Sequence, residues 1–185
     1  MRSVLNQFYG ITLYLAAACL VLIALLVFAQ VLGRVYDGLL RLFGYPPYGF
    51  LVASLAEIAG YLLAAASFLA LAPTLKRGAH IRVTIVLGNV SPRIRHSLEI
   101  WILAVATAFL GFVCWSLVTF VYESYVFKEV SYGIIPMPLW IPQSVMTFGA
   151  CTLLLALFDE LLIVLRGGAP SYREREDAIS LSKEG

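Results

Sequence analysis

Glu57 carries the only charge well inside a long apolar stretch of this sequence, between residues 42 and 75. A charge at the middle of a membrane-spanning helix costs about 2.5 to 3.5 kcal/mol on insertion scales, so this carboxylate should face protein or water and have a partner. One interpretation is a site that couples transport to a proton or binds a cationic drug, as in small exporters. The other is a structural or interface carboxylate, paired within the chain with Arg34 or in contact with a partner. We favour the second interpretation.

A block of cations follows the same apolar stretch and joins a mainly apolar segment over residues 84–90. A simple topology anchor would explain the charges of this block but not its apolar half. We therefore predict that the segment lies along the inner membrane surface, with its cations near lipid phosphates or the acids of a partner. The predicted anchors are Lys76, Arg77, His80 and Arg82. Asp159 and Glu160, at the end of the last apolar stretch, are predicted to meet these cations.

Small residues recur every four positions beside Glu57, at Ala56, Gly60 and Ala64. Such a ridge lets another helix approach closely. It serves either packing within the chain or contact with a partner, and both interpretations stay open. Ala104, Ala108 and Gly111 form a similar series further along the chain.

The remaining reactive side chains argue against a redox enzyme. Cys19, Cys114 and Cys151 lie in different apolar stretches and form no Cys-x-x-Cys pair, which disfavours a disulfide-forming oxidoreductase. His80 and His96 lie outside the apolar stretches, so a haem held by two intramembrane histidines is unsupported. We predict no catalytic residue and no metal site.

Four stretches are long enough to cross a bilayer and would position these groups. With 61% hydrophobic and 13% charged residues among 185, the chain has too little polar surface for a water-soluble globule. A helix needs about 20 residues to cross roughly 30 Å of hydrocarbon. Pro46-Pro47 places the start of the second span near Tyr48, Ser91-Pro92 is a helix start signal before the third, and prolines at 136, 138 and 142 suit the entrance of the fourth. The predicted spans are residues 8–32, 48–75, 98–122 and 138–162.

Lysine and arginine concentrate near the two ends of the chain and in the second loop, whereas the first and third loops hold only Arg34, Arg41 and Lys128. This distribution predicts that both termini face the cytoplasm. The fold class is therefore an all-α integral membrane protein with four transmembrane helices. Short interfacial amphipathic helices are predicted in the first and second loops. Residues 1–166 would form the membrane domain and residues 167–185 a disordered cytoplasmic tail.

The order of these features resembles a known family, the small membrane subunit (Q-type, small permease) of tripartite ATP-independent periplasmic transporters, or TRAP transporters. The most specific part runs from Glu57 through an apolar helix to the basic block over 76–83. Supporting matches are Gly33-Arg34, the segment over 135–142 and Gly149.

The resemblance implies a non-catalytic subunit of a sodium-coupled importer, a secondary active symporter that takes up organic acids across a bacterial or archaeal inner membrane. A large many-helix permease would carry the substrate and sodium sites, and a periplasmic binding protein would deliver the carboxylate. This chain would scaffold the permease among membrane lipids and help to dock the binding protein, with no cofactor and no nucleic acid of its own. The alternative is a self-sufficient, oligomeric, proton-coupled exporter that uses Glu57.

Overall fold

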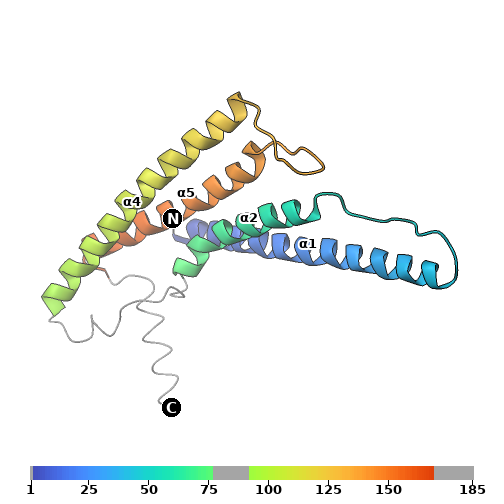
Figure 1. The fold of residues 1–185 in the computed structure, drawn as a ribbon. Helices are drawn as coiled ribbons and strands as arrows, with labels where there is room; N and C mark the ends of the chain where they lie inside the picture. The colour runs from blue at the N-terminus through green and yellow to red at the C-terminus, as the bar shows by residue number, and fades with distance from the viewer. Residues whose placement is uncertain (1, 77–91, 169–185) are drawn as a thin grey trace, which may run out of the picture.

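The computed structural model describes residues 2–76 and 92–168, which form four α-helices (Figure 1). These are α1 (Arg2–Leu42), α2 (Leu55–Lys76), α4 (Pro92–Val126) and α5 (Trp140–Leu165). All four are long and apolar enough to cross a membrane, which confirms the predicted all-α membrane fold. The side on which the termini lie stays a prediction.

Two helix boundaries differ from those predicted. Helix α1 continues through residues 34–42, so the predicted interfacial helix of the first loop is the end of α1 rather than a separate element. The predicted start of the second span near Tyr48 is wrong, because α2 begins at Leu55 and the chain before it is not helical. The third helix begins at Pro92, as the start signal predicts. The second-loop helix and the tail beyond residue 168 lie outside the described residues.

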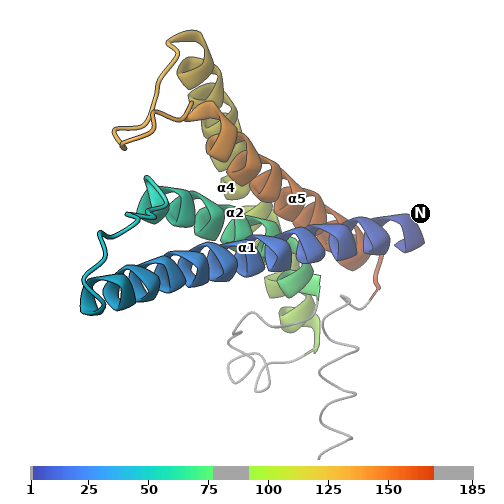
Figure 2. The same ribbon diagram turned by 90° about the vertical axis from the view of Figure 1, so that its right-hand side faces the viewer.

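The helices form two hairpins that share one contact surface. Helix α1 packs on α2, α4 packs on α5, and α2 and α5 join the two hairpins at the centre. Figures 1 and 2 show the hairpins diverging, so that α1 and α4 point away from each other at their far ends. The C-terminal end of α2 lies beside the C-terminal part of α5. These two central helices therefore run in the same direction.

Small side chains line the central contact and let the helices approach closely. Ala16, Ala66 and Leu69 form one buried cluster between α1 and α2, against which Val145 of α5 packs. A Cβ atom on Gly149 would lie 2.6 Å from the carbonyl carbon and oxygen of Phe68. Because those atoms belong to the backbone of α2, only glycine fits where α5 crosses it.

The connection between α1 and α2 folds back along α1. The Asp37 carboxylate accepts hydrogen bonds from the backbone N–H groups of Tyr48, at 2.8 Å, and Gly49, at 3.1 Å. One turn earlier, a Cβ on Gly33 would lie 2.6 Å from Cδ1 of Phe50, whose ring therefore packs directly on the helix backbone. These two contacts hold the apolar residues before Leu55 beside α1 instead of in a longer α2.

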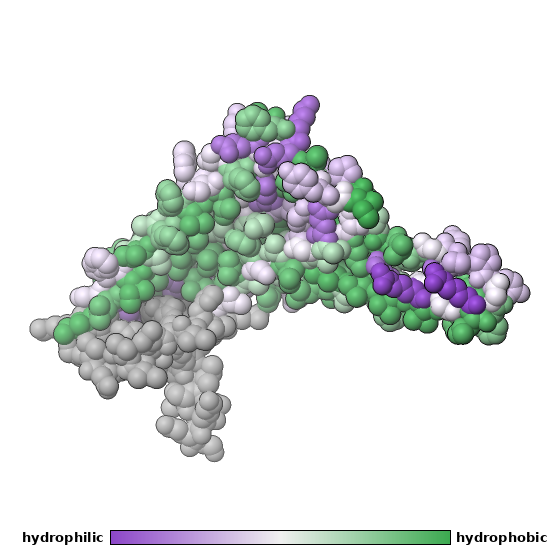
Figure 3. All heavy atoms as spheres, viewed as in Figure 1, coloured by the Kyte–Doolittle hydropathy of each residue, from purple (hydrophilic) through white to green (hydrophobic). Residues whose placement is uncertain are grey.

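Much of the apolar surface stays uncovered by the described part of the chain (Figure 3). Hydrophilic side chains gather at the far ends of the two hairpins, and green apolar surface lies between them. On α4 the exposed residues include large aromatic ones, namely Trp101, Phe109, Phe112 and Trp115. Lipid or another protein must cover such a surface.

Candidate functional site

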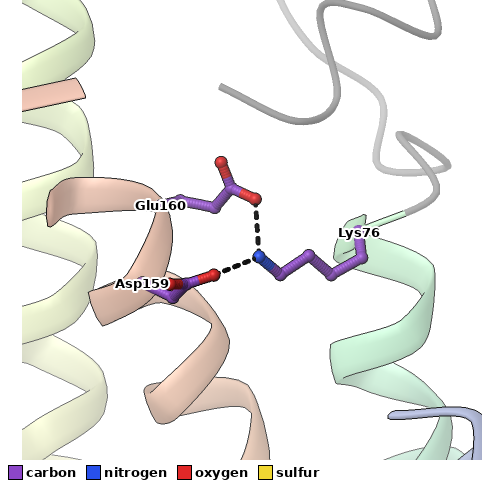
Figure 4. A network of polar contacts seen from close by, with 3 residues as sticks. All are labelled: Lys76, Asp159 and Glu160. Atoms are coloured by element: carbon purple, nitrogen blue, oxygen red, sulfur yellow. Dashed lines mark hydrogen bonds and ion pairs between the residues drawn. The ribbon is translucent and has the colours of Figure 1, made fainter. Parts of the chain in front are cut away.

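One end of the helix bundle is held together by a partly buried ionic cluster (Figure 4). Lys76, the last residue of α2, extends its ammonium group between two carboxylates of α5. Its Nζ lies 2.6 Å from Oδ2 of Asp159 and 2.9 Å from Oε1 of Glu160. The Glu160 side chain is only 1% exposed. The prediction that Asp159 and Glu160 meet the cations of the basic block is confirmed for Lys76.

Helix α1 joins the same cluster through an aromatic side chain. The Lys76 ammonium lies 5.7 Å from the centre of the Tyr9 ring, within the range of a cation–π contact. Tyr9 is buried with Ala72, Leu75 and Ala156. One cation therefore fixes the ends of three helices relative to one another.

Glu57 lies at the opposite end of α2, in its first turn, rather than about two turns inside the span as its position in the apolar stretch predicted. Its Oε1 accepts a hydrogen bond from the hydroxyl of Tyr61 at 2.9 Å. Its Oε2 is buried against the backbone of Gly133, which comes from the connection between α4 and α5. No ion pair joins Glu57 to Arg34 within residues 2–76 and 92–168, so the carboxylate is packed internally against a different part of the chain.

A second contact links the same two segments. The hydroxyl of Ser54, just before α2, accepts a hydrogen bond from the backbone N–H of Ile135 at 3.0 Å. Ser54 adopts a positive φ of 55°, a conformation that few side chains adopt. The pair of contacts, Ser54 with Ile135 and Glu57 with Gly133, ties the start of α2 to the connection of the other hairpin.

The ridge of small residues on α2 faces outward. Ala56 and Gly60 are exposed and Ala64 is half-buried, and nothing lies within 4 Å of where a Cβ of Gly60 would be. The packing of α2 within the chain uses other positions, among them Ala65, Ala66 and Leu69. Within the described residues the ridge is the less buried side of α2, and both interpretations of it, packing within the chain and contact with a partner, stay predictions. Ala104 and Ala108 of α4 are exposed as well.

The cysteines are arranged differently from what their separation in sequence indicates. Cys114 of α4 and Cys151 of α5 lie side by side where these helices pack, as free thiols. Sequence spacing could not reveal this pair, because the two residues meet only through the antiparallel packing of the hairpin.

The predicted site residues do not all lie in one place in the structure. Glu57 and the ridge lie at one end of α2 and Lys76 lies at the other. Arg77, His80 and Arg82 fall outside the described residues. Sequence reasoning missed Ser54, Tyr61 and Gly133, although a tyrosine four residues after a helical carboxylate is a usable signal for a hydrogen bond on one helix face.

The polar contacts described hold segments of this chain to one another. Among the residues that the structure describes, no three His, Cys, Asp or Glu side chains gather in a way that could hold a metal ion. The charged side chains at both ends of α2 bind other helices or connections of the same chain.

The sequence was compared with models of protein families. The family model for the tripartite ATP-independent periplasmic transporters, DctQ component, matches residues 23–167. No curated protein matches the sequence.

Proposed function

Since this chain belongs to the family of DctQ components of tripartite ATP-independent periplasmic transporters, we propose that it is the non-catalytic subunit that supports the transporting partner. Membership makes it the small membrane component of a transporter and a multi-pass membrane protein. The proposal adds that a large permease subunit packs against it and that a periplasmic binding protein docks on the assembly.

The transported solute and its driving force belong to the partners in this proposal. The resemblance supports a sodium-coupled symport of organic acids, with the substrate and sodium sites on the large subunit. In this arrangement the end of the bundle that carries Lys76 and Asp159 faces the cytoplasm of a bacterial or archaeal cell. The end that carries Glu57 and the connection between α4 and α5 faces the periplasm.

The observation that carries the proposal is the open ridge of α2. Ala56 and Gly60 are exposed, while the same helix buries its opposite side against α1 and α5. Small residues on a membrane helix make few contacts with lipid chains, but they allow a second helix to pack closely against the backbone. We therefore assign this ridge to contact with the large subunit.

The alternative of a self-sufficient exporter gains no support from family membership. Its coupling group, Glu57, is hydrogen bonded to Tyr61 and covered by Gly133. This packing supports a structural role for the carboxylate.

Co-purification with the large subunit tests the proposal. Gly60→Leu places a bulky side chain on the ridge, and we expect it to reduce the recovered large subunit at least fivefold. The matched control is Gly38→Leu, because Gly38 is also an exposed helical glycine with nothing within 4 Å of its Cβ position. Its recovery should stay within twofold of the unmodified chain.

Two results would contradict the proposal. One is a chain that stays monomeric in mild detergent when it is co-expressed with the large subunit. The other is uptake of an organic acid by vesicles that contain this chain alone.

A further inference from the structure

The connection between α4 and α5, residues 127–139, must lie outside the hydrocarbon of the membrane. Its backbone is not helical, and its one β-bridge joins Val130 to Pro138. Exposed irregular backbone does not occur in hydrocarbon, because unpaired N–H and C=O groups there are too costly. Helix α4 has 35 residues and is about 52 Å long, so it can carry the connection well beyond roughly 30 Å of hydrocarbon.

Hydrogen bonds hold this connection in one shape. The backbone N–H of Ser131 donates to the carbonyl of Met137 at 2.9 Å, and that of Leu139 donates to the carbonyl of Glu129 at 3.0 Å. The N–H of Met137 also donates to the Ser131 hydroxyl. Together with the contacts to Ser54 and Glu57, these bonds fix both the fold of the connection and its position over the start of α2 (Figure 2).

Inner and outer positions alternate along this connection, and its apolar side chains lie on the outside. A hairpin exposed to water would instead bury its apolar side chains and expose its polar ones. The Ser131 side chain is buried, and the half-buried backbone of Gly133 faces Ser54 and Glu57 at the start of α2. Val130, Tyr132 and Ile134 point outward, with Tyr132 fully exposed and Ile134 84% exposed. A fixed backbone that presents apolar side chains to water is typical of an interaction surface.

The charges beside this surface favour a protein over lipid headgroups. The exposed charged residues of this region are Glu123, Lys128 and Glu129, which is two carboxylates against one ammonium group. A segment that binds a membrane surface through anionic lipids is basic. A net negative surface with a central tyrosine instead suits a protein partner with an apolar patch and a basic or neutral edge.

We propose that Val130, Tyr132 and Ile134 form the surface on which the water-soluble binding protein of the transporter docks. The inference rests on the proposed function and deepens it by naming the contact. Ser54, Glu57 and Gly133 are positioning residues, because they hold the connection without touching the partner. Docking needs no rearrangement of this surface, which keeps the entropic cost of binding low.

Binding of the purified binding protein to the assembled membrane subunits tests the proposal. The chain and its large subunit are placed together in lipid nanodiscs, and the dissociation constant is measured with Tyr132→Ala/Ile134→Ser. We expect binding to weaken at least tenfold. Tyr48→Ala is the matched control, because Tyr48 is an exposed tyrosine in the other connection at the same end of the bundle, and it should change the constant less than twofold.

The outcomes separate this inference from the proposed function. An unmodified chain that holds no large subunit refutes both. If the assembly forms with the double variant and binds as tightly as the unmodified one, the docking surface is wrong while the proposed function stands. A photo-crosslinker at the tip, Tyr132→p-benzoylphenylalanine, gives a second readout: adducts with the binding protein support the proposal, and adducts with phospholipid alone overturn it.

Discussion

Replacing Lys76 by methionine tests whether the ionic cluster holds the two hairpins together. Methionine keeps much of the length and volume of the lysine side chain but removes its charge. The change leaves Asp159 and Glu160 next to each other without the cation that lies between them. We expect a large loss of stability.

The size of the loss follows from the burial of the three side chains. Removing one partner of a buried ion pair costs about 3 to 5 kcal/mol, because the remaining charge is left in a poorly solvated site. Glu160 is 1% exposed and meets this condition, whereas Asp159 is 25% exposed and can gain some hydration. We therefore expect the free energy of unfolding to fall by about 3 kcal/mol, the lower end of that range.

The assay is reversible unfolding of the purified chain in mixed micelles with increasing dodecyl sulfate, followed by tryptophan fluorescence. Lys128→Met is the matched control, because Lys128 is an exposed lysine with no ion pair among the described residues. It should change stability by less than about 0.5 kcal/mol. A double variant, Lys76→Met/Glu160→Met, should recover part of the loss, because it also removes the buried carboxylate that the Lys76 ammonium faces.

If Lys76→Met lowered the free energy of unfolding by less than about 1 kcal/mol, the reasoning would be refuted, because removing one partner of a buried ion pair costs more than that. Glu160→Met is also measured alone. The same conclusion would follow if the loss of stability of the double variant equalled the sum of the losses of Lys76→Met and Glu160→Met. Additivity would mean that the ammonium and the Glu160 carboxylate do not interact.

Four further changes test other contacts. Gly149→Ala should destabilise the isolated chain by about 1 to 3 kcal/mol in the same assay, because the new methyl group meets the backbone of α2. Gly60→Ala places its methyl group where no atom lies within 4 Å, so it should be neutral or stabilising by up to about 1 kcal/mol. If Gly149→Ala and Gly60→Ala changed stability equally, the crossing of α5 over α2 at Gly149 would be contradicted. Tyr61→Phe removes the donor to Glu57 and should cost about 1 to 3 kcal/mol, whereas an unchanged unfolding midpoint would show that the bond is not made. Asp37→Ala frees two backbone N–H groups and should make the connection after α1 cleavable in limited proteolysis, and undiminished resistance would count against this anchor.

The sequence was sufficient to predict the four helices and one of their contacts. Long apolar stretches bounded by charges determine the number and order of the spans, because the cost of charge in hydrocarbon leaves few choices. The meeting of Lys76 with the two acids of α5 was predictable because complementary charges stood at the ends of neighbouring spans. The burial of that contact was not.

The start of α2 and the divergence of the hairpins could not be predicted. Residues 48–54 are mostly apolar and read as part of a span, but Asp37 and Gly33 bind them to α1. These contacts join residues that are not neighbours in sequence, so the local hydropathy does not indicate them. The crossing of α2 and α5 likewise depends on Gly149 meeting Phe68, which only the assembled helices reveal.

The contacts at the centre of the molecule join segments about 80 residues apart, whereas each hairpin is built from neighbours in sequence. Membrane helices insert first and associate afterwards, so each hairpin can enter the bilayer before it meets the other. A chain cleaved between Lys76 and Pro92 should therefore reassemble from its two halves. The ion pairs of Lys76 with Asp159 and Glu160 would then act as the recognition element between two separately synthesised fragments.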